Sequence, residues 1–244
     1  MHSYTLKSFR MFPYYGSKSI IARIYPKPVH GLIIEPFAGS ARYSLQYFDR
    51  DVILIDKYET VVRIWKWLQQ CSEGDILGLP KLKLGDDIRL LNVSEDEKLF
   101  LGMLAGVSGT SPRFKVSPFA AIQNGRKNQL RRIARQLFKI RHWKIEHGDF
   151  KDIENQPATW FIDPPYQFGG NGYVCSKVDY SFLADWSKSR LGQVIVCENT
   201  KADWMPFSPM AKMRGAMSTT TEAIWTNRPT CYNSRQAALF FNCV

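Results

Sequence analysis

The sequence has few cysteines and lacks the patterns that a disulfide framework or a zinc site requires. Five cysteines are spread over 244 residues with no Cys-x-x-Cys pair, and the four histidines do not stand at zinc-binding spacing. No apolar run approaches the roughly 18 residues of a membrane-spanning helix. The first residues also show no apolar signal-peptide core. We therefore expect reduced thiols, no metal, no membrane association and a cytoplasmic location.

Acidic residues are absent from one long stretch, Arg113 to Lys144, which carries ten Lys or Arg residues. This segment nearly accounts for the net charge of +11 of the whole chain. Hydrophobic residues make up 45% of the sequence, which suffices for a full core and excludes global disorder. The charge pattern indicates a polyanion such as DNA or RNA as the partner.

Apolar runs and helical stripes alternate along most of the chain, which predicts a parallel sheet with helices on both faces. The alternation lapses over residues 71–142, where a loop-rich stretch, a helix from Ser94 and a basic helix over 126–141 are expected. We therefore divide the chain into a catalytic part, 1–70 and 143–244, and a mostly helical insertion, 71–142. The expected strands are 31–35, 51–56, 143–146, 160–163 and 193–198, with closing strands at 219–225 and 237–244. The other expected helices are 41–48, 58–70 and 182–189.

Two strand ends carry residues that suit a nucleotide, since ligands of open α/β sheets bind beyond the carboxyl ends of the strands. Gly39 lies in the segment Glu-Pro-Phe-Ala-Gly-Ser-Ala, where it would let a ligand approach the backbone of a tight turn. Asp56 ends the second strand and is placed to accept both hydroxyls of a ribose.

A third strand ends in Asp163, Pro164, Pro165 and Tyr166. The exocyclic amine of adenine is a poor nucleophile, because its lone pair is delocalised into the ring. The Asp163 carboxylate and the Pro164 carbonyl can each accept one N–H of such an amine and aim its lone pair at an electrophile. The prolines fix the backbone, and the Tyr166 ring offers a surface on which a flipped base can stack.

These residues resemble the Dam-like class of S-adenosylmethionine-dependent DNA adenine-N6 methyltransferases. The resemblance begins at Pro13-Tyr-Tyr-Gly-Ser-Lys18 and covers most of the chain outside the insertion. It implies a Rossmann-like α/β methyltransferase sheet, mostly parallel with an antiparallel closing strand, and a small helical insertion. Two positions depart from the family pattern, Ala41 in the glycine motif and Lys57 after Asp56. The resemblance implies S-adenosyl-L-methionine contacts at Tyr14, Lys18, Phe37, Gly39, Asp56, Asp149, Phe150 and Asp163.

The insertion lies where the resembling family carries its target recognition domain. A basic helix and a flexible loop suit phosphate contacts and base-edge readout of double-stranded DNA. Adenine methylation in RNA, amino-methylation of a protein glutamine and a catalytically silent binding subunit remain alternatives, although a protein-glutamine enzyme usually has Asn in place of Asp163. The resemblance also implies a bacterial or phage protein, and we expect a monomer or weak dimer. The expected DNA contacts are Arg113, Lys115, Arg126, Lys127, Arg131, Arg132 and Arg135.

Overall fold

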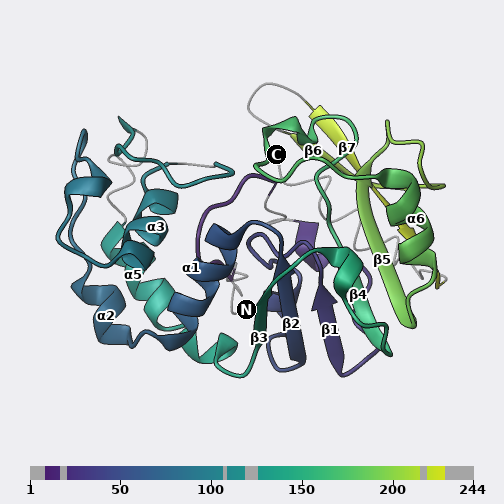
Figure 1. Ribbon diagram of the computed structural model, residues 1–244, viewed down its shortest axis with the longest axis horizontal. Coiled ribbons are helices and arrows are strands. Elements are labelled where there is room, and N and C mark those ends of the chain that lie inside the picture. The colour runs from purple at the N-terminus through teal and green to yellow at the C-terminus, as the bar shows by residue number, and fades with distance from the viewer. Residues whose placement is uncertain (1–8, 17–20, 107–108, 119–125, 215–218, 229–244) are drawn as a thin grey trace, which may run out of the picture.

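The computed structural model describes residues 9–16, 21–106, 109–118, 126–214 and 219–228. A seven-stranded sheet in the order β3-β2-β1-β4-β5-β7-β6 forms the centre of the molecule (Figure 1). The first five strands pair in parallel, and β7 runs antiparallel to both β5 and β6. The predicted Rossmann-like α/β sheet with an antiparallel closing strand is confirmed. The strands are β1 (Leu32–Glu35), β2 (Asp51–Asp56), β3 (Lys144–His147), β4 (Ala158–Ile162), β5 (Gly192–Asn199), β6 (Ser208–Arg214) and β7 (Thr219–Thr226).

Both faces of the sheet are covered, because successive strand residues enter different apolar clusters. Ile33 belongs to one cluster and Ile34 to the other, and Trp160 and Phe161 divide in the same way. This is the alternation that strand geometry imposes, and it explains why these strands read as continuous apolar runs.

One helix on each face shows how the sequence covers the sheet. Helix α1 (Glu59–Gln70) buries an apolar stripe that includes Trp65 and Leu68 in the first cluster. Helix α6 (Tyr180–Lys188) buries Leu183 and Trp186 in the second cluster. The helices predicted at 58–70 and 182–189 are therefore present.

The insertion contains α2 (Glu73–Gly78), α3 (Glu95–Leu104) and α5 (Arg126–Ala134), which lie beside α1 at one end of the molecule (Figure 1). Their buried side chains belong to the same apolar cluster as one face of the sheet. The insertion and the sheet therefore share a core.

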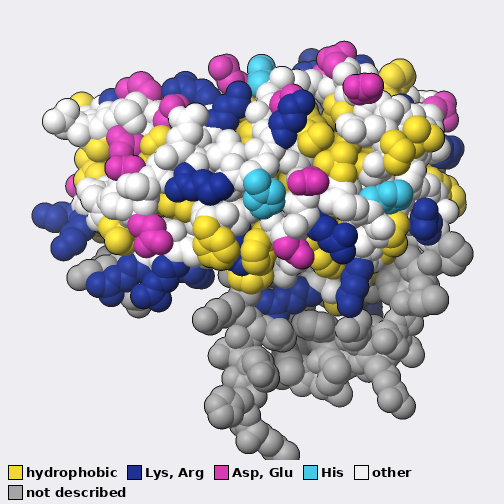
Figure 2. Space-filling model, turned by 90° about the horizontal axis from the view of Figure 1, so that it is seen from below, with side chains coloured by type: hydrophobic (Ala, Val, Ile, Leu, Met, Phe, Trp, Pro, Cys, Tyr) yellow, Lys and Arg dark blue, Asp and Glu magenta, His cyan; other side chains and the backbone are white. Residues whose placement is uncertain are grey.

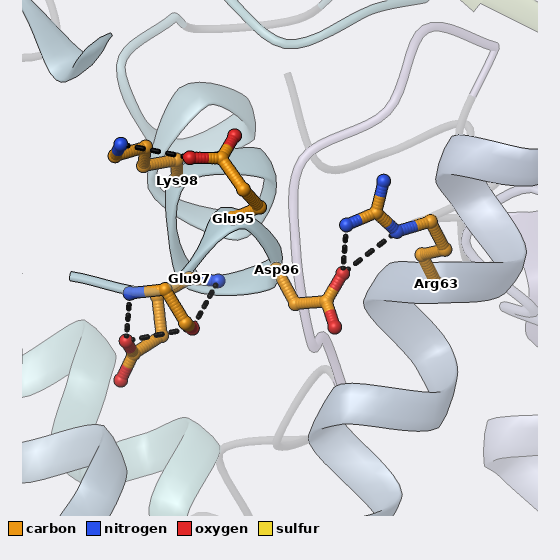
Figure 3. A network of polar contacts seen from close by, with 6 residues as sticks. Arg63, Glu95, Asp96, Glu97 and Lys98 are labelled. Atoms are coloured by element: carbon orange, nitrogen blue, oxygen red, sulfur yellow. Dashed lines mark hydrogen bonds and ion pairs between the residues drawn. The ribbon is translucent and has the colours of Figure 1, made fainter.

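The predicted start of α3 is confirmed. The Ser94 side chain accepts from the backbone N–H of Glu97, and the Glu97 carboxylate accepts from the N–H of Ser94. Beside this capping box, Arg63 of α1 forms an ion pair with Asp96 and joins the two helices (Figure 3). Ser72 and Asp75 make the same box at α2, a short helix inside a stretch that was expected to be loop-rich.

Three expectations on secondary structure were wrong. The helix expected over 126–141 ends at Ala134 and continues as a 3₁₀ turn, Leu137–Ile140, and the helix expected over 41–48 is only a 3₁₀ turn, Ser44–Tyr47. Strand β6 pairs with β7 but was not predicted, since Pro209 and a register shift interrupt its pattern. The expected strand 237–244 lies outside the described residues. Among the helices that the structure describes, none has the length and apolar character to cross a membrane.

Candidate functional site

A cleft at the carboxyl ends of β1, β2, β3 and β4 encloses about 980 Å³, including the space open to solvent. Parallel strands deliver their ends to one edge of the sheet, so segments far apart in sequence meet here. The structure brings together nearly all of the predicted cofactor residues, whereas Lys18 lies outside the described residues. The predicted residues that line the cleft are Tyr14, Phe37, Gly39, Asp56, Asp149, Phe150, Asp163 and Pro165.

Gly39 and Asp56 are joined directly. The Gly39 N–H donates to Oδ2 of Asp56 over 2.9 Å, and the N–H of Tyr58 donates to Oδ1 over 2.8 Å. Gly39 has a φ of 44°, and a Cβ there would lie 3.2 Å from the Tyr14 ring, so the turn favours glycine. Burial raises the pKa of Asp56 to about 6, against the lowering effect of the two N–H donors. Each carboxylate oxygen accepts one backbone bond and keeps a lone pair for a ligand.

Lys57 and Asp149 form an ion pair of 2.8 Å at the rim of the cleft. Burial tends to raise the pKa of Asp149, but the Lys57 hydrogen bond and charge outweigh it and lower the pKa. The Asp149 side chain also accepts from the N–H of Lys151. The departure at Lys57 from the family pattern therefore brings a partner for a residue that was expected to face the cofactor.

Aromatic rings form one wall of the cleft. Phe37 lies 5.3 Å from Phe150 between ring centroids, with the planes 34° apart, and Phe150 packs edge-on against Trp186. The Tyr14 ring lies beside Gly39 in the turn after β1, and burial together with the charge of Asp56 raises its pKa. An aromatic wall beside a strand-end carboxylate suits a flat ring system that carries hydroxyl groups.

Glu35, which in the sequence stands only as part of the glycine motif, is a buried carboxyl group of the cleft. It is 2% exposed and accepts the backbone N–H of Ser44 over 2.8 Å. Burial raises the pKa of Glu35 to about 8, and the nearby Asp163 adds to the rise. Its position at the end of a fully apolar strand was the only sequence signal for this burial.

The predicted catalytic tetrapeptide follows β4 directly. Asp163 and Pro165 line the cleft, Pro164 is buried, and Tyr166 packs against the apolar core. The Tyr180 hydroxyl donates to the Pro165 carbonyl over 2.8 Å. Pro164 does not itself line the cleft, and within the described residues its carbonyl accepts no backbone hydrogen bond.

The segment after the tetrapeptide is fixed by side chains from β5. The backbone N–H of Gln167 donates to Oε1 of Glu198, and the side-chain Nδ2 of Asn199 donates to the Phe168 carbonyl over 2.9 Å. Burial raises the pKa of Glu198, although three hydrogen-bond donors act in the opposite direction. The sequence alone assigns no function to Glu198 at its strand end, and the structure shows that it holds this loop.

The basic surface lies on the insertion. Arg131, Arg132 and Arg135 are exposed on and just after α5, and Arg113 and Lys115 are exposed on the preceding loop. Figure 2 shows dark-blue side chains at the end of the molecule that carries α2, α3 and α5, and others across the rest of this face. The side chains of Arg126 and Lys127 lie outside the described residues.

One lysine of the basic segment does not belong to this surface. Lys139 is 6% exposed, with its Nζ 3.4 Å from the ring centroid of Phe9 and 3.5 Å from that of Phe48. Burial lowers its pKa to about 8. The helical projection placed Lys139 on a polar face, but the change to a 3₁₀ turn after α5 directs it inward.

No family model matches the chain, and no curated protein matches it. Among solved structures, the chain is similar to the "Putative methyltransferase yhhF from Escherichia coli", with 10% sequence identity over 87% of this chain and 82% of that one. The TM-score is 0.37, and a likeness at this level carries no argument about function. The cleft itself is therefore the basis for a functional assignment.

Proposed function

We propose that the protein is an S-adenosylmethionine-dependent methyltransferase that methylates the N6 amine of adenine in double-stranded DNA. The observation that carries the proposal is the position of Asp163 to Tyr166. This segment leaves the central strand β4 at the same cleft that Gly39, Asp56 and Phe150 line. A carboxylate that suits an amine and an aromatic wall that suits a nucleoside thus line one cavity.

The residues of the cleft fit the proposed cofactor. The free lone pairs of Asp56 suit the two ribose hydroxyls, and the ring pair Phe37 and Phe150 offers an apolar wall for a purine. When bound, S-adenosylmethionine supplies a methyl group on a positively charged sulfur. The two departures from the family pattern, Ala41 and Lys57, also line the cleft, so cofactor affinity is the first property to measure.

On the acceptor side, this chain holds the amine. The Asp163 carboxylate and the Pro164 carbonyl accept its two N–H groups, and the Tyr180 hydroxyl holds the neighbouring Pro165 carbonyl. This arrangement directs the nitrogen lone pair toward the methyl group, and the Tyr166 ring stacks on the base. Catalysis then consists of alignment and hydrogen bonding to the reacting nitrogen.

Methyl transfer from radiolabelled S-adenosylmethionine to unmethylated DNA tests this role. Asp163→Ala removes the carboxylate that accepts an N–H of the amine. It should lower the rate of methyl transfer by at least about a hundredfold, while the far-ultraviolet circular dichroism spectrum stays unchanged. Asp185→Ala is the matched control, since Asp185 is an exposed aspartate of α6 whose side chain is 83% accessible. Transfer by Asp163→Ala within about tenfold of the wild type would remove Asp163 from its role.

DNA as the substrate rests on the basic surface of α5 and its neighbouring loop. Replacement of Arg131, Arg132 and Arg135 by Ala should reduce the slope of log K against log salt by roughly 2.7, about 0.9 for each phosphate that the variant no longer neutralises. Replacing three exposed lysines elsewhere, Lys27, Lys188 and Lys201, makes the same charge change away from α5.

The two triple variants separate a specific contact surface from a general charge effect. An equal reduction of slope in both variants would mean that α5 makes no specific contacts. Duplex RNA of the same sequence as substrate separates the two polymers, and preferred transfer to RNA would overturn the DNA assignment.

A further inference from the structure

A buried carboxylate behind the tetrapeptide, Glu222, accepts hydrogen bonds from two tyrosines. The Tyr25 hydroxyl donates to Oε1 of Glu222 over 2.7 Å, and the Tyr166 hydroxyl donates to the same oxygen. Glu222 is 6% exposed and lies in β7 opposite Asn199 of β5 and Ala211 of β6. Burying a carboxylate between two strands costs free energy unless hydrogen-bond donors compensate for the lost water, and the two tyrosine hydroxyls are such donors.

Both tyrosines are committed donors. Burial raises the pKa of Tyr25 and of Tyr166 well above the ordinary value, and the charges of Glu222 and Asp163 add to the rise. Tyr25 also packs edge-on against Phe161, with ring centroids 5.0 Å apart, and Phe161 lines the cleft. Tyr25, Tyr166 and Glu222 therefore form one hydrogen-bonded unit behind the cleft residues Phe161 and Pro165.

The backbone on both sides of Tyr166 is already fixed. Pro165 precedes it and is held by Tyr180, and the following N–H, that of Gln167, is held by Glu198. The Tyr166 ring packs against the apolar core, and its hydroxyl end donates to Glu222. Glu222 therefore anchors this end of the side chain.

We propose that Glu222 is a positioning residue that fixes the ring of Tyr166 for stacking on the acceptor base, with Tyr25 holding the carboxylate in place. The proposal rests on the proposed function, since it concerns the ring that contacts the base. Neither Glu222 nor Tyr166 is among the residues that line the cofactor cleft, so Glu222 acts through Tyr166, which directly follows the cleft residue Pro165. A misplaced stacking surface lowers the rate of the aligned reaction more than it weakens binding.

A mutant cycle on Glu222 and Tyr166 tests the proposal. Glu222→Ala should lower kcat about tenfold, while the dissociation constants for S-adenosylmethionine and for DNA change less than about threefold. Glu222→Gln keeps an oxygen that can accept a hydrogen bond, so its kcat should be closer to that of the wild type. This variant also replaces Glu222→Ala in the test if Glu222→Ala does not fold. In a Tyr166→Phe background, Glu222→Ala should cause less than about a twofold further reduction.

The matched control is Tyr43→Phe. Tyr43 is a fully buried tyrosine whose hydroxyl donates to the Pro26 carbonyl over 2.7 Å, and it does not line the cleft. It should retain kcat within about twofold, because its ring and packing remain. An unchanged kcat in both Glu222 variants, or an undiminished effect in the Tyr166→Phe background, would overturn the proposal.

Nuclear magnetic resonance of ¹³Cζ-tyrosine protein separates this proposal from the proposed function. Tyr166→Phe and Tyr25→Phe assign the two signals, and Glu222→Gln should shift both of them. If the wild type methylates no DNA, the proposed function fails. The two tyrosine signals still test whether Glu222 contacts Tyr166 and Tyr25. An unshifted Tyr166 signal in Glu222→Gln would overturn the positioning proposal whatever the activity.

Discussion

Glu35 provides a prediction that can be worked through from its surroundings. Its carboxyl group is 2% exposed, and burial raises its pKa to about 8, from a usual value of 4.5. Between about pH 6 and about pH 8 the folded protein therefore holds a proton on Glu35 that the unfolded chain has released. The folded state binds more protons, so the free energy of unfolding falls as the pH rises through this window.

The size of the effect follows from the width of the window. Each pH unit in which the proton is held only by the folded state contributes about 1.4 kcal/mol, so the decrease from about pH 6 to about pH 8 is at most about 3 kcal/mol. Asp56, whose pKa is raised to about 6, also titrates in the lower half of this window, but it is present in both proteins that the experiment compares. Lys139, with a pKa lowered to about 8, begins to lose its proton only at the top of the window.

Glu35→Gln isolates this contribution. The amide oxygen of glutamine can still accept the N–H of Ser44, but the side chain no longer titrates. Urea unfolding followed by circular dichroism, at several pH values, should show that the wild type loses about 2–3 kcal/mol relative to Glu35→Gln across the window. Parallel stability curves for the two proteins would refute the reasoning, since Glu35 would then have the same pKa in both states.

Three further predictions concern the start of β5, the start of α3 and the cleft. Gly192→Ala should lower the free energy of unfolding in urea by more than about 3 kcal/mol, because the φ of Gly192 is 101° and a Cβ would lie 2.2 Å from a backbone oxygen of β4. Gly85→Ala is the control; it has open space around it and should cost about 1–2 kcal/mol. Ser94→Ala should cost about 1 kcal/mol because it removes the capping box, and Asp96→Ala less than about 1 kcal/mol because its ion pair is exposed; equal costs would contradict this order. Asp56→Ala should weaken S-adenosylmethionine binding by about 1.5–3 kcal/mol in calorimetry and leave DNA binding unchanged, and unchanged cofactor affinity would refute the assignment.

Much of the sheet could be predicted from sequence because its strands are buried on both faces. Such strands appear as short apolar runs that stand out from the helices between them, as in β2 and β4. Strand β6 could not be found in this way, because it lies at the sheet edge, contains Pro209 and pairs with a register shift. Edge strands need no continuous apolar pattern, so periodicity does not report them.

The sequence predicted the site residues at the strand ends but not the side-chain contacts that hold them in place. Asp56 and Asp163 could be placed because parallel strands bring their carboxyl ends together. The contact between Tyr166 and Glu222 joins residues 56 positions apart, and only the antiparallel placement of β7 beside β5 brings them close. Lys139 shows the same limit, because a helical projection cannot anticipate where a helix tightens into a 3₁₀ turn.

The central claim, methylation of adenine N6 in DNA, is tested most directly by identifying the product. Unmethylated duplex DNA would be incubated with the protein and S-adenosylmethionine carrying a deuterated methyl group, digested to nucleosides and analysed by mass spectrometry. We predict labelled N6-methyldeoxyadenosine with the wild type and none with Asp163→Ala. No labelled adenine from the wild type, or label on cytosine instead, would contradict the claim.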